Sequence, residues 1–131
     1  MDLGLRGKTA FITGGSKGVG KHTAAIMAEE GANVAIFARG QAELDEATEW
    51  IQKRTGRKVL AISGDVTSDL DVEAGIKATV EAYGGLDIVV NNAGSAAGRP
   101  FSSISIADWQ GDLDLKLYGA IRVIQAALPH L

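Results

Sequence analysis

The sequence predicts an α/β domain of the doubly wound kind, in which a parallel sheet carries helices on both faces. Four short and almost wholly apolar runs alternate with four segments of helical spacing. Strands that lack an alternation of apolar and polar residues belong to sheets that are covered on both sides. Polar or glycine-rich motifs follow these runs, and right-handed crossovers bring the carboxyl ends of such strands to one rim. We therefore treat residues 1–131 as one domain with its candidate site at that rim.

The first strand is expected at residues 9–12, where the sequence is short and apolar. A helix follows with a core at residues 22–28, and Gly31 stands just beyond its end, as is common at helix C-termini. The next apolar run predicts a second buried strand at residues 33–38.

The second helix is amphipathic. Leu44, Ala47 and Ile51 share one face, charged residues take the other, and Gly56 ends the helix. A third strand is expected at residues 58–62.

The third helix has three possible N-cap residues, Thr67, Ser68 and Asp69. Its apolar stripe consists of Val72, Ile76, Val80 and Tyr83. Two glycines at 84–85 end it, and a fourth strand follows at residues 86–90. A last helix is expected from about residue 106 to 128 because apolar residues recur at helical spacing. These residues are Leu113, Leu117, Ile121, Ile124 and Leu128.

Composition argues against several classes of protein. The net charge is −3 with both signs interspersed, so the chain lacks the continuous positive surface that nucleic-acid binding needs. No run resembles a membrane span or a secretory signal, which makes a cytoplasmic location the expectation. There is no cysteine, and His22 and His130 lack the spacing of metal ligands. We expect no metal and no nucleic-acid or membrane partner.

A glycine loop joins the first strand to the first helix: Thr13-Gly14-Gly15-Ser16-Lys17-Gly18-Val19-Gly20. A strand that feeds a glycine turn and then a helix directs backbone N–H groups and the positive end of the helix dipole at one point, which favours an anion. Gly14 permits a turn with positive φ, Gly18 a close approach to a pyrophosphate, and Gly20 close packing of helix and strand. The loop therefore predicts a dinucleotide site rather than an ordinary glycine-rich turn. Its expected cofactor contacts are Gly14, Ser16, Lys17, Gly18, Val19 and Gly20.

The same stretch partly fits a nucleoside-triphosphate loop. Residues 15–21 match G-x-x-x-x-G-K, but the next position, where a hydroxyl group would hold magnesium, is His22. Imidazole is a poor magnesium ligand, so a nucleotide hydrolase is the weaker alternative. In the favoured interpretation Lys21 is a solvated helix lysine.

The second strand ends in Ala38-Arg39. An NAD-specific site would place a carboxylate there, about nineteen residues after Gly20, to accept the ribose hydroxyls. Without a carboxylate to repel it, a 2′-phosphate could bind both Arg39 and Lys17 through charge-assisted hydrogen bonds. NADP(H) is therefore favoured over NAD(H). The alternative is that Arg39 only lies at a helix start on the surface.

Two further motifs follow the third and fourth strands. The carboxylate of Asp65, in Asp65-Val66, can accept backbone N–H bonds from the next turn or bind an adenine amino group, so capping alone is the alternative. In Asn91-Asn92-Ala93-Gly94 the amides can tie neighbouring loops together, and the small residues leave room for a ribose or nicotinamide; a plain turn is the alternative. The expected cofactor contacts are Asp65, Val66, Asn92, Ala93 and Gly94.

Together these motifs resemble the short-chain dehydrogenase/reductase family, whose members are Rossmann-fold oxidoreductases. Residues 13–20 fit the family's T-G-x-x-x-G-x-G loop, Asp65-Val66 its adenine contact, and residues 91–94 its strand-stabilising and ribose-side motif. Arg39 and Lys17 look like the basic pair of its NADP-preferring classical members. The resemblance covers the whole chain. It implies hydride transfer between NADP(H) and a small-molecule carbonyl or secondary alcohol, in a homodimer or homotetramer.

Two departures from the family concern catalysis. The family usually has an asparagine seven residues after a tryptophan, where it helps to hold a proton-relay water; counting from Trp109 gives Lys116. Lys116 either donates into the site or covers the helix surface with its stem, since an ammonium group cannot accept a hydrogen bond. In the family, the catalytic serine and the Tyr-x-x-x-Lys pair come later in the sequence than the region that corresponds to residues 129–131. Neither Tyr83 nor Tyr118 has a lysine four residues later.

The resemblance therefore implies the cofactor-binding half of an enzyme about twice as long, and we expect these residues alone to be inactive. Residues 1–131 would then be a fragment of that enzyme, a partial structure of it, or a half-domain completed by a partner. The strand at 86–90 and one face of the last helix would then be uncovered and invite association. A noncatalytic NADP(H)-binding module is the alternative. Residues 95–101 are expected to border the substrate, with Arg99 either attracting an anion or lying in solvent.

Overall fold

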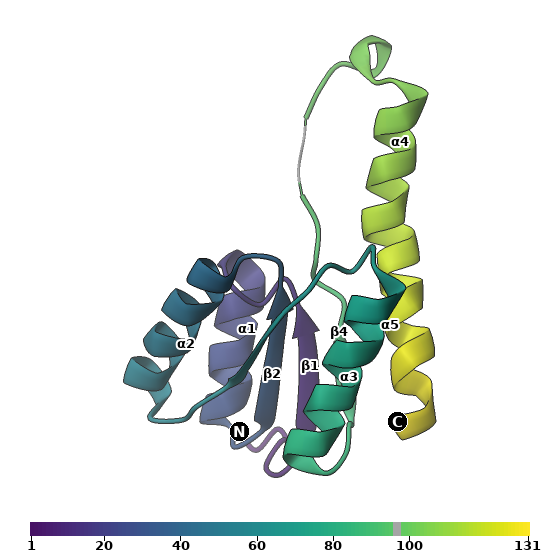
Figure 1. Ribbon diagram of the computed structural model, residues 1–131. Helices are drawn as coiled ribbons and strands as arrows, with labels where there is room; N and C mark the ends of the chain where they lie inside the picture. Colours follow the sequence, from purple (N-terminus) through teal and green to yellow (C-terminus); the bar gives the residue numbers. More distant parts are fainter. Residues whose placement is uncertain (96–97) are drawn as a thin grey trace.

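The computed structural model describes residues 1–95 and 98–131 (Figure 1). Its four strands form one parallel sheet in the order β3-β2-β1-β4. The strands are β1 (Thr9–Thr13), β2 (Asn33–Ala38), β3 (Leu60–Ser63) and β4 (Ile88–Val90). The two central strands agree with the prediction to within one residue. The edge strands β3 and β4 each begin two residues later than predicted, because their pairing with β2 and β1 begins only at Leu60 and Ile88.

Three helices cover the first part of the sheet, namely α1 (Gly18–Glu29), α2 (Gln41–Thr55) and α3 (Asp69–Tyr83). As predicted, α2 and α3 end at glycines with left-handed backbone, Gly56 and Gly84. Of the three possible caps of α3, Ser68 is the one used, because its hydroxyl accepts a hydrogen bond from the backbone N–H of Asp71.

The last helical segment is continuous but not uniform. It consists of α4 (Ile106–Leu113), a π-helical turn η2 (Asp114–Tyr118) and α5 (Gly119–Ala127). Short 3₁₀ turns, η1 (Phe101–Ser103) and η3 (Leu128–His130), flank it. Figure 1 shows α4 rising beyond the carboxyl ends of the strands, whereas α5 lies beside α3. No helix among the described residues is long and apolar enough to cross a membrane.

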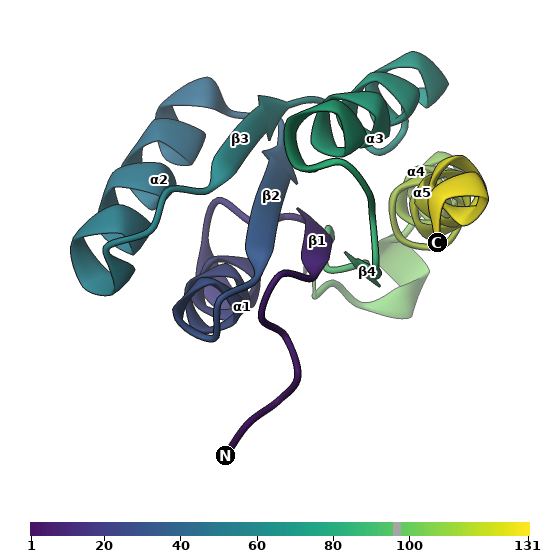
Figure 2. The same cartoon turned by 90° about the horizontal axis from the view of Figure 1, so that it is seen from below.

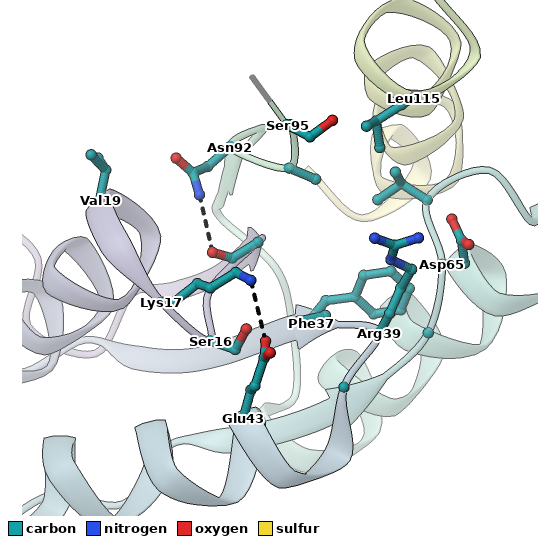
Figure 3. Close-up of a pocket in the computed structure, with 17 residues that line it drawn as sticks. Ser16, Lys17, Val19, Phe37, Arg39, Glu43, Asp65, Asn92, Ser95 and Leu115 are labelled. Carbon is teal, nitrogen blue, oxygen red and sulfur yellow. Dashed lines mark hydrogen bonds and ion pairs between the residues drawn. The ribbon is translucent and has the colours of Figure 1, made fainter. Parts of the chain in front are cut away.

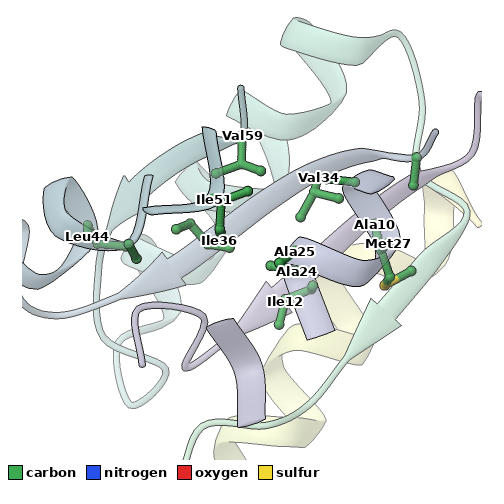
Figure 4. Packing of buried hydrophobic residues seen from close by; sticks show 13 residues of the cluster. Ala10, Ile12, Ala24, Ala25, Met27, Val34, Ile36, Leu44, Ile51 and Val59 are labelled. Carbon is green, nitrogen blue, oxygen red and sulfur yellow. The ribbon is translucent and has the colours of Figure 1, made fainter. Parts of the chain in front are cut away.

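The helices cover both faces of the sheet, as Figure 2 shows: α1 and α2 lie on one side, α3 and α5 on the other. Successive strand residues point to opposite faces. Ala10 and Ile12 accordingly belong to the core under α1 and α2, which Figure 4 shows, while Phe11 packs in the core under α3 and α5. The ring centroids of Phe11 and Phe37 lie 5.4 Å apart in that second core. The doubly wound prediction is confirmed.

The large apolar stripe of the last helix does not pack on the sheet. Leu113, Leu117, Ile121, Ile124 and Leu128 are all exposed. The residues that α5 buries are Gly119, Val123 and Ala127. The helix thus packs on the domain through these three residues and leaves the leucine and isoleucine stripe exposed, in agreement with the expected uncovered face.

Candidate functional site

A pocket of about 620 Å³ opens at the carboxyl ends of the strands (Figure 3). All four predicted rim motifs contribute to its lining. Of the predicted site residues it is lined by Gly14, Ser16, Lys17, Val19, Arg39, Asp65, Val66, Asn92, Ala93 and Gly94. Gly18 and Gly20 belong to the same motif and lie in the first turn of α1, but they are not among the lining residues. The topology therefore brings together residues that are up to 80 positions apart in the chain.

The glycine loop turns sharply at Gly14, whose φ is 65° and whose N–H donates to the carbonyl of Phe37 at 2.8 Å. Gly18 also has positive φ, 57°. Gly20 allows the close approach of α1 to the end of β1, as its predicted role in packing helix on strand requires. A Cβ atom at Gly20 would lie 2.5 Å from Nδ2 of Asn92 and would collide with the carbonyl of Gly14. Gly20 thus leaves space for the contact between those two residues.

Thr13 and Asn92 join the ends of β1 and β4. The buried hydroxyl of Thr13 accepts hydrogen bonds from the backbone N–H groups of Asn92 and Ala93, both at 3.0 Å, and donates to the carbonyl of Val90 at 3.4 Å. The Asn92 amide donates to the carbonyl of Gly14 at 3.1 Å (Figure 3). The expected role of an asparagine amide in tying loops together is confirmed for Asn92.

The N-terminus of α1 faces this pocket with its backbone donors available. Its N-cap residue, Lys17, has extended backbone, makes no side-chain cap hydrogen bond, and is followed by no acidic residue in the first turn among the described residues. Ser16 and Val19 line the pocket on either side of it. Uncapped N–H groups and the positive end of a helix dipole form a site for an anion.

The two predicted cations lie at different sides of the pocket. Figure 3 shows Arg39 beside the Phe37 ring and toward Asp65, whereas Lys17 turns toward Glu43. Nζ of Lys17 lies 3.6 Å from Oε2 of Glu43. The sequence led us to expect no carboxylate that would repel a 2′-phosphate. That expectation holds for the end of β2 but is wrong for the pocket as a whole, because Glu43 lines it. The second strand ends without one, but α2 begins three residues later and its first turn places Glu43 at the rim.

Asp65 is held by the turn that follows it. Its Oδ1 accepts hydrogen bonds from the backbone N–H of Thr67 at 2.9 Å and from the Thr67 hydroxyl at 2.8 Å. The backbone hydrogen bond lowers the pKa of Asp65 most, and the nearby charge of Arg39 also lowers it. The capping role considered for Asp65 therefore exists in the structure. Its neighbour Val66 is buried and packs where Gly119 brings α5 close.

Lys116 lies beside the pocket and is held by another side chain. Its Nζ is 2.9 Å from Oδ1 of Asp112, one turn earlier in the helix. Its Cε lies 4.0 Å from the position that a Cβ atom would take at Gly94. The stem of Lys116 therefore passes close to Gly94 while its ammonium group is paired with Asp112. The adjacent Leu115 is the residue of η2 that lines the pocket.

Neither tyrosine lies in this pocket. The hydroxyl of Tyr83 donates to the carbonyl of Val34 at 3.1 Å, and burial raises its pKa. Tyr118 is exposed. Both placements agree with the expectation of a core residue and a surface residue.

Two other cations considered from the sequence are engaged elsewhere. Nζ of Lys21 lies 4.5 Å from the centroid of the Trp50 ring, which gives the triphosphate-loop alternative no support. Nη2 of Arg99 lies 3.1 Å from Oδ2 of Asp108 in the first turn of α4. Residues 96 and 97 of the expected substrate-side segment lie outside the described residues. Among the described residues, no group of three or more histidine, cysteine or acidic side chains could hold a metal ion.

Sequence reasoning missed several residues of the pocket lining. These are Phe37, Ala38, Gly40, Glu43, Gly64 and Leu115, whereas Ser95 belongs to the segment 95–101 that the sequence placed beside the substrate. Gly64 carried a usable signal, because it separates the third strand from Asp65; a Cβ atom there would lie 2.5 Å from the Phe37 ring. Glu43 also carried a usable signal, since it follows Arg39 closely in the sequence and lies in the first turn of α2.

Comparison with known proteins decides the family. A family model described as short chain dehydrogenase matches residues 8–131. The chain belongs to the short-chain dehydrogenase/reductase family. An uncharacterized oxidoreductase of Staphylococcus epidermidis is 32% identical over 127 residues, which make up 97% of this chain and 54% of that protein. A 3-oxoacyl-[acyl-carrier-protein] reductase of Staphylococcus aureus is 36% identical over 124 residues, or 95% of this chain and 50% of that protein.

Solved structures of this short-chain dehydrogenase/reductase family share the fold. The L-sorbose reductase from Gluconobacter frateurii, complexed with NADPH and L-sorbose, superposes with a TM-score of 0.91 at 34% identity and covers 99% of this chain and 49% of its own. A dehydrogenase/reductase from Sinorhizobium meliloti gives 0.91 at 37% identity, covering 97% and 50%. The chain spans about half the length of the curated relatives it matches.

Proposed function

We propose that this chain is the NADP(H)-binding part of an oxidoreductase that transfers hydride between the nicotinamide and a carbonyl or secondary alcohol. The observation that carries the proposal is that an uncapped helix N-terminus, Lys17 and Arg39 all line one pocket. An anion with several charges fits that set of donors. Family membership and the NADPH bound to L-sorbose reductase support a nicotinamide cofactor.

Each part of the pocket has a role in this proposal. The turn formed by Gly14, Ser16, Gly18, Val19 and Gly20 would hold the pyrophosphate through backbone N–H groups. Lys17 and Arg39 would bind the 2′-phosphate. Asp65 and Val66 would contact the adenine, and Asn92, Ala93 and Gly94 would border the ribose and nicotinamide. The bound cofactor would supply the hydride, and these residues would orient it.

NADP(H) is proposed over NAD(H) because two cations, Lys17 and Arg39, line the pocket, and the carboxylate of Glu43 is already paired with Lys17. The other carboxylate there, that of Asp65, already accepts two hydrogen bonds from Thr67. A phosphate dianion gains charge-assisted hydrogen bonds from both cations.

Neither Tyr83 nor Tyr118 is among the residues that line the pocket. A general acid must lie within hydrogen-bond reach of the proton it transfers, and Tyr83 and Tyr118 both lie away from the pocket. We therefore propose that these 131 residues bind the cofactor but do not turn over a substrate. A noncatalytic NADP(H)-binding module is the second candidate, and the same observation on the two tyrosines favours it.

The exposed apolar face of the last helix supports the proposal of a homo-oligomer, because a continuous apolar surface of this kind favours burial against a partner. The face is formed by Leu113, Leu117, Tyr118, Ile121 and Ile124. We also propose a cytoplasmic location for the protein. Light scattering coupled to size exclusion tests the oligomer directly, and a monomer at micromolar concentration would contradict it.

The test of the proposed function is binding of NADPH and of NADH to the purified chain, followed by nicotinamide fluorescence. Arg39→Asp should weaken NADPH binding more than NADH binding. Lys58→Asp is the matched control, because Lys58 makes the same charge change at the amino end of β3, away from the pocket. A folded chain that binds neither nucleotide would contradict the proposal that this part binds the cofactor on its own.

A further inference from the structure

The carboxylate of Glu43 opposes the proposed cofactor, because it is negatively charged and lines the same pocket. Its carboxylate lines the pocket and lies 3.6 Å from Nζ of Lys17, which is one of the two cations assigned to the 2′-phosphate (Figure 3). We propose that Glu43 determines cofactor specificity: by competing for Lys17 it lowers the affinity for NADP(H) and leaves that for NAD(H) unchanged. This inference rests on the proposed function of the pocket.

The fold holds the carboxylate of Glu43 at the rim. Helix α2 begins at Gln41, its N-cap Gly40 makes no side-chain cap, and Glu43 is the acidic residue of its first turn. A carboxylate in the first turn is stabilised by the helix dipole. The Glu43 side chain also lies against the N-cap, because a Cβ atom at Gly40 would be 3.6 Å from its Cδ and Oε2.

The ion pair with Lys17 is weak enough for a ligand to break. The side chains of Lys17 and Glu43 are 77% and 53% exposed, and exposed pairs contribute little free energy. A phosphate monoester carries up to about two negative charges and binds a lysine more strongly than one carboxylate does. Lys17 can therefore leave Glu43 for a 2′-phosphate.

The carboxylate stays behind when Lys17 moves. It then lies near the bound phosphate and repels it, whereas the ribose 2′-hydroxyl of NAD(H) is neutral and meets no such repulsion. Two unit charges about 4 Å apart in water change a binding constant about fivefold. We expect an effect of about fivefold to tenfold, since the phosphate carries more than one charge.

The experiment compares Glu43→Gln with wild type, using dissociation constants of NADPH and NADH from nicotinamide fluorescence and of 2′,5′-ADP and 5′-AMP by competition. Glu46→Gln is the matched control: Glu46 is exposed on the same helix, does not line the pocket, and makes the same change of charge. Glu43→Gln should tighten NADPH and 2′,5′-ADP about fivefold to tenfold and change NADH and 5′-AMP less than twofold. In a Lys17→Met background the part of the gain that comes from repulsion between Glu43 and the phosphate should remain, and the part that comes from competition for Lys17 should be lost.

Each other result overturns the inference in a recognisable way. Tight NADPH binding by wild type with no gain in Glu43→Gln leaves the proposed function in place and refutes the role of Glu43. A full gain in the Lys17→Met background refutes the competition for Lys17. Weaker NADH binding by Glu43→Gln would make Glu43 a ribose ligand and contradict the inference. If the folded wild-type protein binds none of the four nucleotides, the proposed function fails as well.

Discussion

Thr13 offers the sharpest test of how the rim is held together. Its hydroxyl accepts hydrogen bonds from two consecutive backbone N–H groups, those of Asn92 and Ala93, and its side chain is only 1% exposed. Thr13→Val keeps the shape but removes the acceptor. Each N–H group that is buried without a partner costs about 1–3 kcal/mol. Because Asn92 and Ala93 are only partly buried, we expect Thr13→Val to cost about 2–3 kcal/mol in the free energy of unfolding.

Thr13→Ser is the control, because it keeps the hydroxyl and loses one buried methyl group, at a cost of about 1 kcal/mol. Urea unfolding followed by circular dichroism measures both variants. Thr13→Val should also weaken NADPH binding, since the loop from Asn92 to Gly94 loses its anchor. Equal stability of the two variants would refute the assignment of the loss to the hydrogen bonds.

Three further predictions follow from the same structure. Gly20→Ala should destabilise the protein by about 1–3 kcal/mol and abolish NADPH binding, whereas Gly111→Ala, in open space on α4, should be neutral or stabilising in the same urea titration. Arg122→Met should lower the thermal midpoint, because Arg122 donates to both Asp69 and Asp114; an unchanged midpoint would contradict a structural role. The pKa of Asp65 is lowered on folding, so its contribution is present above its ordinary pKa of about 4 and is lost as pH falls through the folded value. Asp65→Asn should therefore flatten the loss of stability below about pH 4, measured by thermal unfolding across that range.

The sequence was sufficient for the fold because each element carries its own local signal. The apolar runs of β1 and β2, the glycines that end α2 and α3, and the cap at Ser68 are all local features, and each appears where expected. The predicted starts of the edge strands β3 and β4 were less accurate, because the extent of an edge strand depends on the neighbour with which it pairs.

The site was predictable only in part, for a related reason. The motifs themselves were visible, yet their side-chain partners lie far away in the chain. The amide of Asn92 bonds Gly14, 78 residues earlier. Lys17 meets Glu43, which the sequence assigned only to the polar face of a helix. Gly20 was assigned to the packing of helix on strand, but the sequence did not reveal that a Cβ atom there would also collide with the amide of Asn92. Such pairings depend on the tertiary structure, so a motif can indicate that a ligand binds without revealing what competes with it.

The last helix shows how two sequence signals can point to different faces. Its large apolar residues establish that the segment is helical, but they are exposed. The face that packs is formed by Gly119, Val123 and Ala127, and a Cβ atom at Gly119 would lie 2.9 Å from Cγ2 of Val66, so α5 approaches the loop after β3 closely. Arg122 then secures that approach by donating to the carbonyls of Val66 and Asp114. Close packing of a helix on a domain requires small residues at the contact, whereas a stripe of leucine and isoleucine indicates only that some apolar surface must be buried. This domain leaves that stripe exposed, which is why we propose that it is buried against a partner.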